Sequence, residues 1–361
     1  MTDFPALGLD DIEALAVGAW ILGTGGGGSP YLGLLNMRRL YAEGHRVHLM
    51  PPEALADDDW VAVVSNMGAP LVGQERLTDS RTIARAVALM EEHRGVFFRA
   101  VMSLEIGGGN AIQPLMAAAH LAKPVVDADT MGRAYPEAQM TSVAVGDLRP
   151  YPLTSVDCRG VESIVEKVPS WKWMERVSRK ICTEYGSIAS TCKAPRTGRE
   201  VKDWGILHTT TKAISIGRAV REAQARHRDP IEAILRVEPG KVLFRGKVVD
   251  VERRTTEGFL RGKAAIAGLD QDRGGRVVLE FQNEWIIAWR DGEAIVMSPD
   301  LICVLDSVAG EAVGTETIRY GQRVTVIALP PPAVFTTPKG LRHVGPEAFG
   351  YHVPYKPVFA S

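Results

Sequence analysis

The chain has 361 residues, of which 45% are hydrophobic and 24% charged, so it can bury a large core and divide into about two domains. Its 42 basic and 43 acidic residues leave a net charge of -1, which excludes an overall field directed at nucleic acid or an anionic membrane and favours a small ligand. No apolar run approaches the ~20 residues that span a bilayer, no signal-peptide pattern opens the chain, and the four cysteines are too scattered for a disulfide framework. We therefore expect a cytoplasmic protein that binds neither nucleic acid nor membrane.

The first elements are two helices joined by a glycine-rich stretch. Asp10 and Asp11 can begin a helix through "IEALAVGAWIL", and Ser29-Pro30 can begin a second one through "YLGLLNMRRLYAEG". Between them, "GTGGGG" satisfies the G-x-G-x-x-G pattern by letters, but a dinucleotide site needs a strand before the loop. We therefore expect no nucleotide cofactor, and we predict a loop whose bare backbone lets another segment or a substrate ring come close.

Strands and helices then alternate along residues 45–129. The sequences "HRVHLM", "WVAVVSNMG", "GVFFRAVMS" and "KPVVDAD" are typical of short strands, and "DSRTIARAVALMEEH" and "AIQPLMAAAHLA" of helices. Three more strands are predicted at "TSVAVGD", "YPLTSVD" and "SIVEKVP". Residues 1–170 are thus predicted to form an α/β domain with a partly parallel sheet.

The remainder of the chain divides into three parts. We predict two helices in 171–238, "WKWMERVSRKICTEYGSIAS" and "DWGILHTTTKAISIGRAVREAQAR", packed on the α/β domain. Closely spaced short strands with Gly, Asp and Pro turns in 239–330 indicate an all-β barrel or sandwich. A proline-rich tail, 331–361, has aromatic residues that could pack on a surface.

Three segments of the first domain carry polar residues just beyond predicted strands: "SNMGAPLVGQE", "SLEIGGGNAIQP" and "VVDADTMGRAYPEAQM". In open α/β sheets ligands bind beyond the carboxyl ends of strands, so these segments are expected to converge on one crevice. The residues predicted to bind substrate there are Gly25, Gly26, Gly27, Gly28, Glu75, Gly107, Gly108, Gly109, Asn110, Arg133 and Lys202.

Four carboxylates are the candidates for catalysis: Asp127, Asp129, Glu105 and Glu137. Asp127 and Asp129 alternate along a strand, so they are expected to share a face, where two like charges need a cation, a shared proton or an arginine. They could form an acid/base pair or hold one divalent metal, or they could pair with Arg133 in a structural salt bridge. Glu105 alone could instead cap a helix.

Other polar residues have plainer alternatives. Gly107–Gly109 could present N–H groups to a substrate oxygen or could be only a tight turn. No histidine pattern indicates zinc, and His208 stands out only through its polar neighbours. Asn283 and Glu284 in "QNEW" are interpreted as barrel-turn residues or satisfied polar pairs.

Taken together, the motifs "GTGGGG", "GAP" followed by Glu75, "EIGGGN", "VDADTMGRAYPE", "TGREVKDWGILHTTTKA" and "QNE" resemble the DUF917 family, S-methyl thiohydantoin desulfurase-like and associated with hydantoinase/oxoprolinase proteins. The resemblance covers nearly the whole chain in the family's order. It implies an α/β domain followed by a β-barrel-like domain, and hydrolytic removal of sulfur from a thiohydantoin ring to give a hydantoin. At position 208 it implies glycine, where this chain has His208.

We therefore expect a hydrolase whose partner is a small heterocyclic substrate, and on general grounds a homo-oligomer. Asp127 or Asp129 would activate water, directly or through a metal, and Glu105 or Glu137 would move protons. The alternatives are a hydrolase of hydantoin or oxoproline-type cyclic amides and a non-catalytic protein that binds a small metabolite.

Overall fold

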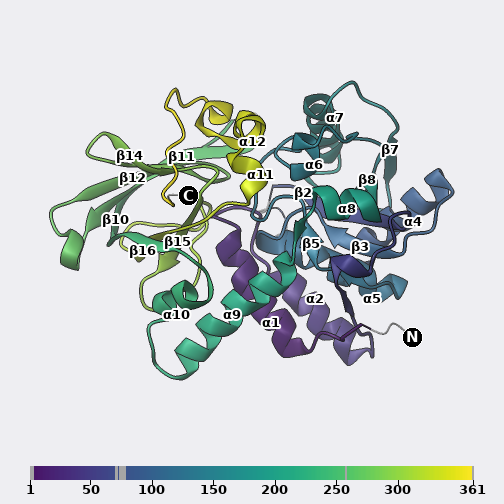
Figure 1. Cartoon of the computed structure of the whole chain (residues 1–361), viewed down its shortest axis with the longest axis horizontal. Helices are drawn as coiled ribbons and strands as arrows, with labels where there is room; N and C mark the ends of the chain where they lie inside the picture. Colours follow the sequence, from purple (N-terminus) through teal and green to yellow (C-terminus); the bar gives the residue numbers. More distant parts are fainter. Residues whose placement is uncertain (1–3, 70–71, 73–78, 257, 360–361) are drawn as a thin grey trace.

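The computed structural model describes residues 4–69, 72, 79–256 and 258–359. Figure 1 shows an α/β domain and a curled antiparallel sheet side by side, with the C-terminal tail between them. No helix of these ranges is long and apolar enough to cross a membrane.

The α/β domain is built on a mixed seven-stranded sheet in the order β1-β4-β3-β2-β8-β6-β7. The first four strands in this order run parallel, and β8, β6 and β7 add antiparallel pairings. The predicted partly parallel sheet is therefore confirmed. The strands are β1 (Leu49–Met50), β2 (Trp60–Gly68), β3 (Ala100–Ser103), β4 (Val125–Val126), β6 (Leu153–Val156), β7 (Glu162–Val165) and β8 (Ile188–Thr197).

Helices cover both faces of this sheet, and β5 (Ala128–Asp129) pairs with β9 (Ile206–Leu207) beside it. The main core lies on one face, where residues of β2 and β3 pack against apolar residues of six α-helices. Those helices are α1 (Leu9–Leu22), α2 (Tyr31–Ala42), α4 (Arg81–Arg94), α5 (Gln113–Leu121), α9 (Thr209–Ala225) and α10 (Pro230–Val237). The others before the second sheet are α6 (Ser142–Val145), α7 (Trp171–Glu184) and α8 (Gly198–Trp204), with the short 3-10 helices η1 (Pro52–Ala54) and η2 (Gly108–Ala111).

Three predicted elements are wrong in type or extent. Residues 141–147 were expected to form a strand, but Ser142–Val145 form α6, because the Thr141 hydroxyl accepts a hydrogen bond from the Ala144 N–H and caps a helical turn. The helix predicted through residue 190 ends at Glu184, and strand β8 begins at Ile188. The helix predicted over 203–226 is interrupted by strand β9, and α9 begins only at Thr209.

Strand β8 was not recognised because its buried positions carry small polar residues. Thr191 donates to the Ser65 carbonyl, and the Ser190 hydroxyl bonds Thr82. These partners come from distant elements, so the hydroxyls are satisfied in a buried strand although no apolar alternation marks it. The segment 171–238 thus contributes a strand to the middle of the sheet as well as helices.

The second sheet is entirely antiparallel, in the order β14-β13-β12-β11-β10-β16-β15, and curls into a half-barrel. Phe244, Trp285 and Val326 are among its fully buried residues. The predicted all-β region is confirmed in this half-barrel form. The strands are β10 (Lys241–Thr256), β11 (Phe259–Gly268), β12 (Arg276–Gln282), β13 (Glu284–Arg290), β14 (Glu293–Met297), β15 (Leu301–Asp306) and β16 (Arg323–Leu329), with η3 (Asp270–Asp272) after β11.

The C-terminal tail packs against both parts of the molecule (Figure 1). Its elements are α11 (Ala333–Thr336), α12 (Pro338–Val344) and η4 (Pro346–Phe349). Phe335 is buried against Tyr135 of the α/β domain. Farther along, Asp300 of the half-barrel accepts hydrogen bonds from the Tyr355 hydroxyl and the Val358 N–H.

Candidate functional site

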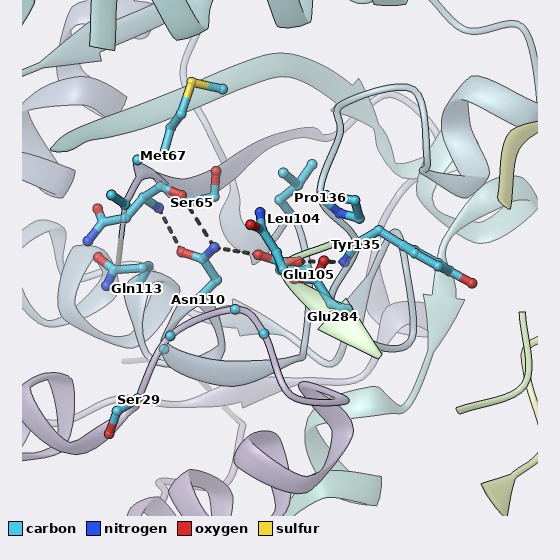
Figure 2. Close-up of a pocket in the computed structure, with 18 of the residues that line it drawn as sticks. Ser29, Ser65, Met67, Leu104, Glu105, Asn110, Gln113, Tyr135, Pro136 and Glu284 are labelled. Carbon is cyan, nitrogen blue, oxygen red and sulfur yellow. Dashed lines mark hydrogen bonds between the residues drawn. The ribbon is translucent and has the colours of Figure 1, made fainter. Parts of the chain in front are cut away.

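A pocket of about 430 Å³ lies between the α/β domain and the half-barrel. Its walls come from the glycine loop after α1, the ends of β2 and β3, helix α7, strand β8 and the half-barrel turns near Leu260 and Asn283. The volume suits one small ring compound. Figure 2 shows Glu105, Asn110 and Glu284 in this pocket above the glycine loop.

The glycine loop brings the two domains into contact. A Cβ atom on Gly26 would lie 2.0 Å from Glu284 Oε1, and one on Gly25 would lie 2.4 Å from Trp285 Nε1. We call this contact between the glycine loop and the half-barrel the seam. Two backbone hydrogen bonds of 2.8 Å cross it, from the Trp285 N–H to the Thr24 carbonyl and from the Thr315 N–H to the Gly25 carbonyl. The predicted close approach is confirmed, and the approaching segment is the half-barrel.

The second glycine segment packs directly on the first. The Gly109 N–H donates to the carbonyls of Gly27 and Gly28 at 3.0 and 2.9 Å, so it is not available to a substrate oxygen. Gly107 and Gly108 pack against Ala134 and Gly27 and lie outside the pocket lining, whereas Gly109 and Asn110 belong to it. The tight-turn interpretation therefore fits these glycines.

Glu105 is held inside the pocket by neighbouring backbone and amide groups. Its Oε1 accepts a hydrogen bond from Asn110 Nδ2 at 2.6 Å, and its Oε2 accepts one from the Tyr135 N–H at 3.3 Å. Asn110 is itself fixed, because its Oδ1 accepts from the Asn66 N–H at 2.7 Å. Burial raises the pKa of Glu105 to about 7, although these hydrogen bonds oppose the shift.

Glu284 is a second buried carboxyl group in the same pocket. It is only 2% exposed, and its Oε2 has no hydrogen-bond partner among the described residues. Burial, followed by the negative charge of Glu105, raises the pKa of Glu284 well above its usual value. At neutral pH the two groups are therefore suited to hold one proton and one negative charge.

The sequence interpretation of "QNEW" holds for one residue and fails for the other. Asn283 makes the turn, since its φ is +58° and its Oδ1 accepts from the Leu260 N–H at 2.9 Å. Glu284 is not a fully satisfied polar residue, because its Oε2 has no partner in the described part of the chain. No local pattern distinguishes the two side chains, so the pocket carboxyl could not be recognised before the domains were in place.

Asp127 and Asp129 lie outside the pocket lining. Asp127 Oδ1 accepts from the N–H groups of Thr210 and Thr211 at 2.9 and 3.0 Å, and its Oδ2 accepts from the Thr211 hydroxyl at 2.5 Å, so it caps α9. Asp129 accepts from the N–H groups of Ile106, Met131 and Gly132. We correct the predicted pair to two structural carboxylates.

The same hydrogen bonds argue against the predicted metal site. The oxygens of both aspartates already face N–H and O–H donors, which a cation would have to displace. Among the described residues there is no group of three or more His, Cys, Asp and Glu side chains that could hold a metal ion. Asp127 and Asp129 therefore do not fit a divalent ion.

Arg133 neither binds in the pocket nor pairs with an aspartate, contrary to both predictions. It is fully buried, and it donates to Thr24 Oγ1 at 2.6 Å, to the Asp300 carbonyl at 3.1 Å and to the Trp285 carbonyl at 3.4 Å. Its guanidinium also stacks over the Tyr135 ring, 4.4 Å from the ring centroid. Arg133 thus ties the glycine loop to the half-barrel.

The other predicted residues divide between the pocket and the surface. Glu137 lines the pocket and accepts hydrogen bonds from Gln139 Nε2 at 2.6 Å and from Gln282 Nε2 at 3.3 Å. Lys202 lies elsewhere, donating to the Leu55 carbonyl and to Asp57. Glu75 lies outside the described residues.

Lys193 is a pocket residue that the sequence analysis missed. It extends from β8, opposite Val63 of β2, into the wall that α7 shares. Burial lowers its pKa to about 8. The sequence "STCKAPRT" is a run of small and β-branched residues before a helix cap, which is compatible with a strand. Its polar residues, Lys193 among them, interrupt the apolar alternation by which a strand is recognised.

Two family models match successive parts of the chain. The S-Me-THD-like N-terminal domain matches residues 10–167, and the S-Me-THD-like C-terminal domain matches residues 169–358. The chain belongs to the S-Me-THD-like family. The resemblance drawn from the motifs is therefore confirmed, and the boundary between the two models at about residue 168 assigns β8 to the C-terminal model although it lies in the first sheet.

A solved structure has a similar fold. It is the X-ray structure of a protein from Chromobacterium violaceum, a Northeast Structural Genomics Consortium target, with 22% sequence identity and a TM-score of 0.81; the alignment covers 98% of this chain and 100% of the other. No curated protein matches the sequence.

At position 208 this S-Me-THD-like chain has histidine where glycine is expected, and the structure shows the backbone conformation and the contacts of that histidine. His208 has φ +61°, in the left-handed region that favours glycine. Its ring lies 3.0 Å from Glu53 Oε1 and 3.6 Å from Asp127 Oδ2. These polar contacts at the start of α9 offset part of the backbone strain, and His208 lies outside the pocket lining.

Asp127 substitutions test the capping role. We expect Asp127→Ala to lower the free energy of unfolding by about 1–2 kcal/mol, because the first N–H groups of α9 lose their acceptor. Asp127→Asn keeps one acceptor oxygen and should lose less. Chemical denaturation measures both; an Asn variant that is as stable as the wild type but has lost ligand turnover would contradict a purely structural role.

Glu284→Gln tests the buried carboxyl pair through stability. Folding raises the pKa of the Glu284 carboxyl group, whereas in the unfolded chain a glutamate ionises above pH ~4.5. The free energy of unfolding of the wild type therefore falls as the pH rises above ~4.5. We therefore expect the variant to exceed the wild type in unfolding free energy by roughly 1–3 kcal/mol at pH 8, and to match it near pH 4.5. Thermal unfolding across that range is the measurement, and a difference independent of pH would contradict the assignment.

Proposed function

We propose that this S-Me-THD-like protein is a hydrolase that removes the methylthio group from an S-methyl thiohydantoin ring, giving a hydantoin and methanethiol. The observation that carries the proposal is the pair of buried carboxyl groups, Glu105 and Glu284, in one ring-sized pocket with raised pKa values. Family membership supports the same chemistry.

The reaction needs a base and an acid close together. Water must lose a proton as its oxygen attacks the ring carbon that carries sulfur, and the adjacent ring nitrogen must gain a proton as the C=N bond becomes single. The hydroxyl of the tetrahedral intermediate then loses its proton as C=O forms and the C–S bond breaks. The departing thiolate takes up a proton, so one water is consumed for each thiol released.

Glu105 and Glu284 suit opposite roles in these steps. Glu105, with a pKa of about 7, is substantially ionised at neutral pH and acts as the base toward water. Glu284, whose pKa is raised further by burial and by Glu105, keeps its proton and gives it to the ring nitrogen. When the intermediate collapses, Glu284 recovers a proton from the hydroxyl. Glu105 still holds the proton that it took from water, and its first state returns only when a proton equivalent has passed to the departing thiolate.

Asn110 and Glu137 complete the pocket without moving protons. Asn110 orients the Glu105 carboxylate through the 2.6 Å hydrogen bond from its Nδ2. Glu137 is already engaged by two amide groups, from Gln139 and Gln282, which favours a positioning role at the pocket wall. This proposal moves the activation of water from Asp127 or Asp129 to Glu105, and it gives Glu284 the acid role in place of Glu137.

Thiol release from an S-methyl thiohydantoin panel tests the proposal. We expect Glu105→Gln and Glu284→Gln each to lower kcat by ~10²–10⁴-fold, the usual contribution of a proton-transfer group. Glu347→Gln, at an exposed position, is the matched control and should leave the rate unchanged. Consumption of hydantoin or oxoproline rings in preference to sulfur compounds would point to a cyclic-amide hydrolase, and tight binding without turnover to a metabolite-binding protein.

The pH profile of kcat/KM gives a separate check. We expect activity to rise as Glu105 ionises, with a midpoint near pH 7, because only its ionised form accepts the proton from water. Activity should fall again at higher pH as Glu284 loses its proton. A Glu105→Gln variant should lack the rising limb in its residual activity; the same limb in that variant would assign it to another group.

A further inference from the structure

Among the described residues that line the pocket, Lys193 has a side-chain ammonium without a partner. The ammonium makes no hydrogen bond and no ion pair to any described residue, and its neighbours act on it through charge alone. Those neighbours are Glu175, Arg179 and Cys182 of α7 and Glu105 across the pocket.

The nearby groups on α7 are already satisfied by other partners. Arg179 Nε donates to Glu175 Oε1 at 2.6 Å, and Arg179 Nη2 donates to the Pro136 carbonyl at 3.2 Å. The Cys182 thiol is buried and donates to the Met67 carbonyl at 3.2 Å. The ammonium of Lys193 therefore remains as a positive charge in the pocket wall without an ion-pair partner among the described residues, and Glu105 is one of the charges that act on it.

The acidities of Lys193 and Glu105 are close. Burial lowers the pKa of Lys193 to about 8, and burial raises the pKa of Glu105 to about 7. A proton can pass between groups of similar acidity with little loss of free energy, and an acid of this strength can give its proton to a basic thiolate at neutral pH.

We propose that Lys193 is the proton donor to the departing thiolate, the catalytic group that the carboxyl pair leaves unassigned. This inference rests on the proposed desulfurisation. The C–S bond breaks, the electron pair moves to sulfur, and the Lys193 ammonium gives sulfur a proton to form the thiol. Glu105, which took a proton from water, returns it to the neutral Lys193 amine, so no group changes state over the cycle.

Two substrates that differ only in the leaving group provide the test. Methanethiolate is strongly basic and needs a proton, whereas 4-nitrothiophenolate leaves readily without one. We expect Lys193→Met to lower kcat for the S-methyl ring by ~10²-fold or more, and for the S-(4-nitrophenyl) ring by less than about threefold. Lys180→Met, at an exposed position of α7, is the control and should change neither rate.

Lys193→Arg separates proton donation from simple charge. A guanidinium stays charged at all relevant pH values and does not give up its proton. We expect this variant to turn over the S-methyl ring as poorly as Lys193→Met does, while it retains the rate on the S-(4-nitrophenyl) ring. Equal activity of the arginine variant and the wild type on both substrates would overturn the proposal.

Binding of the hydantoin product gives a readout that needs no turnover. The product has no leaving group, so its Kd measured by calorimetry should change less than about threefold in Lys193→Met. A large loss of hydantoin binding, or a raised KM with an unchanged kcat on both substrates, would make Lys193 an anchor for the ring or its substituent and overturn the proton-donor role. Absence of thiol release by the wild-type protein would instead reject the proposed function itself.

Discussion

The pocket depends on the close approach of the glycine loop to the start of β13. A side chain on Gly26 would occupy the space of the Glu284 carboxyl group, and one on Gly25 would displace Trp285. Backbone hydrogen bonds and the buried Arg133 hold the seam at this distance. The domain interface is therefore what places a carboxyl group of the half-barrel beside one of the α/β domain.

The charged groups around this seam fall into two classes, those that hold the structure together and those that lack hydrogen-bond partners. Asp127, Asp129 and Arg133 have their hydrogen-bonding atoms occupied by backbone and hydroxyl groups, so they hold loops and helix ends in place. Among the described residues, Glu284 Oε2 and the Lys193 ammonium lack such partners. Burying a polar group without a partner lowers the stability of the fold. Such groups cluster at functional sites, where a bound ligand can supply the missing partner.

Much of the first domain could be predicted from residue spacing. The helices on either side of "GTGGGG", strand β2 and a partly parallel sheet follow from apolar periodicity and from glycine and proline positions. Strand β8 could not be predicted in this way, because Ser190 and Thr191 are buried only through hydroxyl partners on distant elements. The same limit applies to the site. Glu105 was predicted because it follows a predicted strand, whereas Lys193 was not, because its own strand, β8, was not predicted.

The sequence by itself determined the family, the α/β and β division and the glycine segments that permit close approach, because these depend on local spacing and composition. Only the tertiary structure decided which carboxyl groups face the pocket. Asp127 and Asp129 look reactive in the sequence but accept hydrogen bonds from backbone N–H groups. Glu284 looks like a turn residue, but one of its oxygens has no partner among the residues that the structure describes. Burial and the charges brought near by folding set the proton affinity of a side chain, and both come from segments far apart in the chain.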